Sequence, residues 1–331
     1  MSQESNATPI GWKTLRAARA SVSGHFRGLG AAALGVACFS LTVPATRVAV
    51  PELGVLLVGA GRAVIAGALA LLVFAWRRER MPARADLASL AVVALGVVLG
   101  FPLCSAVALR SVPASHALVI IGLVPMATAL VAVLRNGERP SPKFWLASSL
   151  GAASVLAFGF TQASLRLVAA DGWMLIAVLS AAVGYAEGAR LTRRLGGWRV
   201  ISWALVLSLP LTLGLSLLSL AQHPLPVVVS WQAWLGLGYA GVVSMYLGFF
   251  AWYHGLTRTS VARASQVQLA QPVLGMFWSW LLLGEHLRAP MLVTSGFVVL
   301  CATWASRSAD TGRPAPTLAA VQSRPVAIRI S

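Results

Sequence analysis

Charge-free apolar runs alternate with short basic segments along almost the whole chain. Nine runs contain no Asp, Glu, Lys or Arg, and a helix needs about 20 mostly apolar residues to cross a bilayer. The longest run, 200–257, contains the polar turn Gln222-His223-Pro224-Leu225-Pro226, whose two prolines break a helix. The short run 63–76 reaches back to Leu53 when Arg62 is counted within the span.

The pattern therefore predicts an all-α integral membrane protein with ten transmembrane helices. The predicted spans are 29–49, 53–76, 87–108, 114–134, 144–163, 172–191, 199–220, 231–254, 262–283 and 289–306. Residues 1–28 are predicted to be a cytoplasmic tail, and residues 307–331, with three prolines among small and basic residues, a disordered cytoplasmic tail.

Composition agrees with this class. Hydrophobic residues make up 58% of the 331 residues and charged residues only 11%, so a soluble globular enzyme or a disordered chain is excluded. The net charge of +17 does not indicate nucleic-acid binding, because the basic residues lie in short clusters between apolar runs rather than along one face. The three cysteines lie singly in different apolar runs, so we expect no disulfide framework and no metal site.

The basic clusters also predict the orientation. With the N-terminus inside, 21 of the 26 Lys and Arg residues lie in cytoplasmic segments. We therefore expect both termini in the cytoplasm and the chain in the plasma membrane, which is the inner membrane in a bacterium.

The chain contains an internal repeat. Residues 125–138 read PMATALVAVLRNGE and residues 272–285 read PVLGMFWSWLLLGE, so Pro125, Gly137 and Glu138 match Pro272, Gly284 and Glu285. Leu99-Gly100-Phe101 likewise matches Leu247-Gly248-Phe249. The repeats are predicted at 29–163 and 172–306. Five spans per copy is an odd number, so the second copy enters the membrane from the opposite side, as in the inverted repeats of many secondary transporters.

The span count, this duplication and the Pro…Gly-Glu pattern resemble the drug/metabolite transporter superfamily, EamA-type. The segment GFFAWYHGLTRTSVARASQVQLAQPVLGMFWSWLLLGEHL, residues 248–287, carries the resemblance most specifically, and Gly61-Arg62-Ala63 is similar to that family's arginine position. The resemblance covers about 29–306. It implies a polytopic carrier, commonly an exporter of amino acids, other metabolites or toxic compounds, without a shared cofactor. The first copy departs from the pattern at Arg135-Asn136, which precede Gly137-Glu138.

Two ionisable residues inside predicted spans are candidates for the substrate pathway, because charge within a bilayer is costly. Arg62 is either a fixed cation that attracts a carboxylate or a tie between helices. Glu187 is either an interfacial ion pair with Arg190, at i+3, or a protonatable carboxylate in the cavity.

Uncharged polar residues concentrate in the ninth predicted span. Gln268 and Gln271 lie three residues apart near its middle, with Ser265 below them, and either line a cavity or bond neighbouring helices.

In the eighth predicted span, Tyr246 and Tyr253 share a helix face with two phenylalanines. This aromatic face either packs against neighbouring helices or forms a wall of the ligand site. Trp231, Trp234 and Trp252 are predicted to anchor at the membrane interface. His116 and His254 lie at predicted helix ends and are either interfacial polar groups or proton relays.

These observations favour a secondary active transporter of small metabolites, amino acids or related amphipathic compounds, working by alternating access and exporting them. Its partners are then a small-molecule substrate and the lipid bilayer, with no nucleic acid; the sequence does not define an oligomeric state. The alternatives are a non-transporting membrane scaffold and a membrane-embedded lipid-modifying enzyme, for which no HExxH, paired Asp or Ser with His motif is present.

Overall fold

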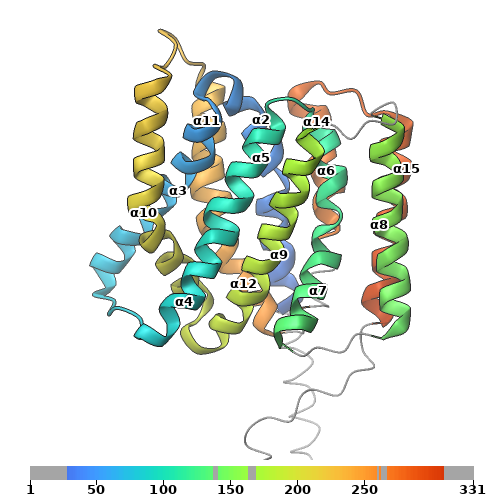
Figure 1. Cartoon of the computed structure of the whole chain (residues 1–331), viewed down its shortest axis with the longest axis horizontal. Coiled ribbons are helices and arrows are strands. Elements are labelled where there is room, and N and C mark those ends of the chain that lie inside the picture. Colours follow the sequence, from blue (N-terminus) through green and yellow to red (C-terminus); the bar gives the residue numbers. More distant parts are fainter. Residues whose placement is uncertain (1–27, 137–140, 163–168, 259–260, 262–266, 309–331) are drawn as a thin grey trace, which may run out of the picture.

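The computed structural model describes residues 28–136, 141–162, 169–258, 261 and 267–308, and every regular element in these residues is a helix (Figure 1). Seven helical segments are long and apolar enough to cross a membrane. They are Gly28–Leu53, Val55–Arg77, Arg84–Leu109, Ala114–Arg135, Ala169–Leu195, Gly197–Gln222 and Trp231–Arg258. The all-helical membrane class is therefore found. The count of ten spans is not confirmed and stays a proposal.

The helices follow the predicted runs, but several spans are divided. The first repeat consists of 28–40, α2 (Thr42–Leu53), α3 (Val55–Arg77), α4 (Arg84–Val93), η1 (Ala94–Gly100), α5 (Phe101–Leu109), α6 (Ala114–Ile121), α7 (Val124–Asn136) and α8 (Pro142–Gln162). The second consists of α9 (Ala169–Leu195), α10 (Gly197–Gln222), α11 (Trp231–Tyr239), η2 (Ala240–Leu247), α12 (Gly248–Arg258), α14 (Ala270–Leu283) and α15 (Ala289–Ser308).

The boundary between the first two predicted spans lies elsewhere in the structure. The second span was expected to begin at Leu53, but α2 continues through Pro51 to Leu53, and Gly54 separates it from α3 with φ of 79°. Only glycine adopts this backbone conformation readily, so the break follows from Gly54 rather than from Pro51.

The bundle is apolar on its outside as well as in its core. Leu72, Leu134 and Val293 expose 67%, 77% and 71% of their surface, whereas the core between the helices contains buried Ala, Val, Leu and Met side chains. A protein in water would hide such an apolar belt. The belt fits an exterior that faces lipid.

Both repeats contain a π-helix at the same place. Element η1 ends at Leu99-Gly100 and η2 ends at Leu247, immediately before Gly248, so each π-helix coincides with one copy of the repeated Leu-Gly-Phe segment. A π-helix shifts the side chains that follow it around the helix axis and is frequent at functional sites. The two repeats therefore share a local backbone feature as well as a sequence motif.

Counterpart helices of the two repeats run antiparallel. Ser141, directly before α8, donates a hydrogen bond to the carbonyl of Ser308 at the end of α15. Arg199 at the start of α10 forms an ion pair of 2.7 Å with Glu79, which follows the end of α3. The pair α8 and α15 stands at one edge of the bundle and α10 at the other (Figure 1).

Glycines let helices of opposite repeats cross closely at two related places. A Cβ on Gly184 of α9 would lie 2.6 Å from Val97 of η1, and a Cβ on Gly96 would lie 2.6 Å from the Ser180 carbonyl oxygen. A Cβ on Gly35 would in turn lie 3.1 Å from the carbonyl oxygen of Gly248, just after η2. The two π-helical regions therefore each contact a helix of the other repeat at backbone distance.

Candidate functional site

A small cavity lies between the two repeats, beside both π-helical regions. Its walls come from 28–40, α2, α3, η1, α5, α9, η2, α12 and α14. The lining residues are Phe39, Thr42, Arg62, Val97, Phe101, Tyr185, Ser244, Phe249 and Gln271. The volume open to the centre of a water molecule is about 20 Å³, which is room for about one water. A metabolite could enter this cavity only after helices move apart.

Arg62 gives the cavity its charge. It is the eighth residue of α3, about 10 Å along the helix axis from Val55, and its exposed fraction is 2%. Its Nε and Nη1 atoms have no hydrogen-bond partner. A guanidinium stays protonated in proteins and prefers planar, two-pronged contact with a carboxylate or phosphate. The residue is therefore a buried cation with unused donors that face a cavity.

Amide groups lie beside this cation. The side-chain oxygens of Gln268 and Gln271 are buried and have no partner, and Gln271 lines the cavity. Tyr185 lines the same cavity as Arg62 and Gln271. Also in the cavity wall, the hydroxyl oxygens of Thr42 and Ser244 lie 2.6 Å apart, so one donates to the other.

The ninth predicted span is interrupted at these glutamines. Gln268 and Leu269 form a turn and α14 begins at Ala270, so Gln271 and Pro272 lie in its first turn. The fourth predicted span is interrupted in the same way at Gly122-Leu123, and Pro125 lies in the first turn of α7. A proline fits this first turn because no intrahelical donor is needed there. Broken helices at matching places in two repeats are typical of transporter binding sites.

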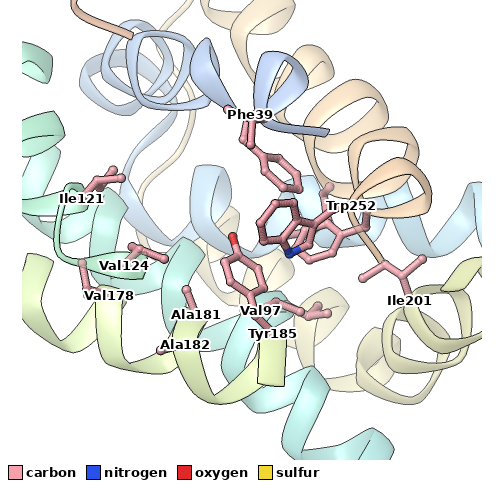
Figure 2. Packing of buried hydrophobic residues seen from close by; sticks show 14 of the residues in the cluster. Phe39, Val97, Ile121, Val124, Val178, Ala181, Ala182, Tyr185, Ile201 and Trp252 are labelled. Carbon is pink, nitrogen blue, oxygen red and sulfur yellow. The ribbon is translucent and has the colours of Figure 1, made fainter. Parts of the chain in front are cut away.

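Aromatic rings form the apolar part of the wall. Phe101 and Phe249, the last residues of the two Leu-Gly-Phe segments, both line the cavity. The rings of Phe39 and Phe249 have centroids 5.0 Å apart, and Tyr185 packs on Phe249 at 5.9 Å. Figure 2 shows the rings of Phe39, Tyr185 and Trp252 brought together from three separate helices.

The structure places Trp252 differently from the prediction. It was expected to be an interfacial anchor, but it is fully buried and its ring lies 5.4 Å from that of Tyr185. Trp231 and Trp234 are exposed, at 69% and 46%, as interfacial residues are. Trp252 faces inward because α12 packs against 28–40 and α9 rather than against lipid.

Glu187 does not line the cavity. Its carboxylate accepts a hydrogen bond from Arg190 of the same helix and lies 3.6 Å from Arg135 of α7, while Arg190 also donates to Ser89 of α4. Glu187 is thus buried between two cations that belong to different repeats. Its role in the substrate pathway stays a prediction.

Tyr246 and Tyr253 are buried beside the cavity rather than in its wall. The Tyr246 hydroxyl accepts a hydrogen bond of 3.3 Å from Ser202, and the Tyr253 hydroxyl donates one of 3.2 Å to the carbonyl of Gly184. Both hydroxyls therefore join α9 and α10 to the eighth predicted span. Ser265 of the predicted site lies outside the described residues, as do Gly137 and Glu138.

The second copy of the repeat motif joins the repeats. Gly284 ends α14 in the left-handed conformation, with φ of 62°. Glu285 then accepts two hydrogen bonds of 2.9 Å from the backbone N–H groups of Ala114 and Ser115, which begin α6. A carboxylate at this place satisfies donors that have no partner within the helix.

His116 of α6 is also buried and joins the repeats. Its Nε2 atom lies 2.8 Å from a carboxylate oxygen of Asp171 at the start of α9. Spans 114–135 and 169–195 are therefore tied at one end by His116 and Asp171 and at the other by Arg135 and Glu187.

Sequence reasoning missed several of these residues. Tyr185, Phe39, Thr42 and Ser244 occur singly in apolar runs, where nothing in the spacing separates a cavity wall from ordinary packing. The repeated Leu-Gly-Phe segment was a usable signal, since its phenylalanines occupy matching places in the cavity.

Comparisons with known proteins agree with the fold. A profile of the EamA-like transporter family matches the chain twice, over residues 26–160 and 168–307. The chain is 44% identical over 279 residues to a Bacillus subtilis (strain 168) protein described as "Uncharacterized transporter YdeK", covering 83% of this chain and 96% of that protein. It also resembles a solved crystal structure, named without a function, at 20% identity and a TM-score of 0.60, over 86% of this chain and 98% of the other. That last likeness concerns the fold alone.

Proposed function

We propose that this chain, which belongs to the EamA-like transporter family within the drug/metabolite transporter superfamily, is a secondary active transporter that exports small amphipathic metabolites, amino acids or related compounds. Membrane transport follows from the family and from its multiple apolar helices. The substrate type, the direction and the alternating-access mechanism are our proposal. The observation that carries it is the polar cavity between the repeats, with the unpartnered cation of Arg62 in its wall.

The proposed architecture has ten spans in two inverted five-helix repeats, at 29–163 and 172–306, with both termini cytoplasmic in the plasma membrane. The antiparallel course of α8 and α15 supports the inversion, as does that of α3 and α10. Contacts between repeats support it too: α9 packs on η1 and α4 in the way that α2 packs on η2 and α11. This equivalence is expected when a two-fold axis in the membrane plane exchanges the repeats.

Alternating access requires each repeat to move against the other while the site stays between them. The cavity meets this requirement because Phe101 and Val97 come from one repeat and Phe249 and Ser244 from the other, with Phe101 and Phe249 at matching places. A lipid-modifying enzyme would need a general base near its substrate, and within the described cavity wall no histidine or carboxylate lies beside Thr42 and Ser244.

A labelling experiment tests this proposal without knowledge of the substrate. Cys38, Cys104 and Cys301 are replaced by alanine, and Ser244→Cys is introduced into the cavity wall. A membrane-impermeant maleimide is then added to intact cells or to inverted membrane vesicles. Alternating access predicts reaction of Ser244→Cys from both sides.

Two matched controls mark the sides. Trp231→Cys replaces an exposed tryptophan that follows the turn predicted to lie outside. Trp76→Cys replaces an exposed tryptophan that precedes the basic cluster predicted to lie inside. Each is expected to react from one side only. Labelling of Ser244→Cys from a single side, or from neither while both controls react, would contradict the transport proposal and favour a scaffold.

A further inference from the structure

In the described residues, the acidic side chains lie away from the cavity and the cation of Arg62 lies in its wall. This distribution of charge bears on the substrate. Each of the six described acidic residues lies within about two turns of a helix end and has a hydrogen-bond or ion-pair partner. Glu52 bonds Ser230, Glu79 pairs with Arg199, Asp86 with Arg194, Asp171 with His116, Glu187 with Arg190 and Arg135, and Glu285 bonds the start of α6. None of the six lines the cavity.

Arg62 is therefore uncompensated at the centre. Its exposed fraction is 2%, two of its nitrogen atoms have no partner, and no described acidic side chain is paired with it. An isolated buried charge is costly unless a counter-charge arrives from elsewhere. A bound carboxylate on the substrate would supply that charge and the two acceptor oxygens that a guanidinium prefers.

The start of α14 adds to the positive potential. Gln271 is the second residue of this 14-residue helix and lines the same cavity as Arg62. The first turn of a helix carries a partial positive charge and favours anions. Two independent features of the wall therefore favour a negative group at one end of the cavity.

The glutamines indicate a second group on the substrate. The side-chain oxygens of Gln268 and Gln271 are buried acceptors without a donor. A hydroxyl would satisfy one of them without adding charge. An ammonium would also donate, but it would restore the uncompensated positive charge that the carboxylate had removed.

We propose that the transported substrate is an amphipathic monocarboxylate with a neutral hydroxyl and an apolar body, such as a 2-hydroxy acid, rather than a zwitterionic amino acid. The carboxylate binds Arg62, the hydroxyl donates to Gln271, and the body packs against Phe101 and Phe249. This inference rests on the proposed transport function and narrows its substrate class.

A panel of compounds with one phenyl body separates these groups. The panel consists of 3-phenyllactate, 3-phenylpropanoate, phenylalanine and phenylalaninamide, which differ only in the polar end. Binding is measured by calorimetry on the purified protein, and uptake by counterflow in proteoliposomes. We expect phenyllactate to bind most tightly, phenylpropanoate about tenfold more weakly, phenylalanine more weakly still, and the amide not at all.

Variants assign the contacts. Arg62→Gln is expected to weaken phenyllactate binding by 10-fold or more, and Arg62→Lys to restore part of it because the charge returns. Gln271→Leu is expected to remove the advantage of phenyllactate over phenylpropanoate and to leave the affinity for phenylpropanoate unchanged. Gly214→Ala, where a Cβ meets no atom within 4 Å, is the matched control for folding.

The outcomes separate the two proposals. Phenylalanine binding as tightly as phenyllactate overturns the monocarboxylate inference and leaves transport standing. If neither phenyllactate nor phenylalanine binds while Ser244→Cys is still labelled from both sides, the substrate class alone is overturned. One-sided labelling overturns transport itself, whatever the panel gives.

Discussion

Removal of the Glu285 carboxylate tests how the repeated Gly-Glu motif holds the two repeats together. In the structure this side chain accepts hydrogen bonds of 2.9 Å from both Ala114 and Ser115 at the start of α6. Glu285→Ala leaves these two backbone donors without a protein acceptor. Glu285→Gln keeps one acceptor oxygen but loses the charge.

The expected magnitude follows from known capping energies. Loss of a helix cap costs about 0.5–2 kcal/mol, and an anion beside the helix dipole contributes roughly 0.3–1 kcal/mol. We therefore expect Glu285→Ala to lower the free energy of unfolding by about 2 kcal/mol and Glu285→Gln by about half of that. With an unfolding entropy of about 2.1 cal/mol/K per residue over 331 residues, 2 kcal/mol corresponds to roughly 3 °C in melting temperature.

The measurement is thermal unfolding of the purified protein in one detergent, with tryptophan fluorescence as the signal. His286→Ala is the matched control, because His286 is exposed and adjacent. Equal melting temperatures for Glu285→Ala and His286→Ala would refute the capping argument. The same repeat predicts that Glu138→Ala, at the matching place in the first copy, lowers the melting temperature by a similar amount.

Three further predictions concern topology, helix crossing and coupling. Reporters fused before Met1 and after Ser331 should both report cytoplasm; opposite readings would contradict the even number of spans. Gly96→Ala should destabilise the protein by about 1–3 kcal/mol, since its Cβ would lie 2.6 Å from the Ser180 carbonyl oxygen, whereas Gly214→Ala should be neutral or slightly stabilising in the same melting assay. Glu187→Gln should retain the pH dependence of transport in proteoliposomes, because the carboxylate is already paired with Arg190 and Arg135; retained exchange with loss of pH-driven accumulation would instead identify Glu187 as the proton carrier.

Much of the fold could be predicted because it depends on local pattern. The apolar runs gave the helices, and the repeated Pro…Gly-Glu segments gave two copies that the family profile also matches. Arg62 and Gln271 stood out in the sequence because polar residues within apolar runs are few, and both line the cavity in the structure. Their part in transport stays a prediction.

The features that escaped prediction depend on contacts between the repeats. Apolarity identifies buried residues in a soluble protein, but in a membrane protein both the lipid-facing and the core-facing sides of a helix are apolar. The sequence therefore could not distinguish buried Trp252 from exposed Trp231. The roles of Glu285 and Asp171 were also hidden, since each partner lies more than 50 residues away along the chain.

Polar contacts near both ends of two spans connect the closed cavity to the proposed mechanism. The spans 114–135 and 169–195 belong to different repeats and are joined near one end by His116 and Asp171 and near the other by Arg135 and Glu187. The cavity has room for about one water molecule in this conformation, so these two spans cannot stay fixed at both ends while a metabolite passes between the repeats. A monocarboxylate that neutralises Arg62 would contribute binding free energy toward separating one pair, and the pair that remains would keep the opposite end closed. In the proposed alternating-access mechanism, the contact that breaks decides which end opens, and the central cation is the group that senses an occupied site.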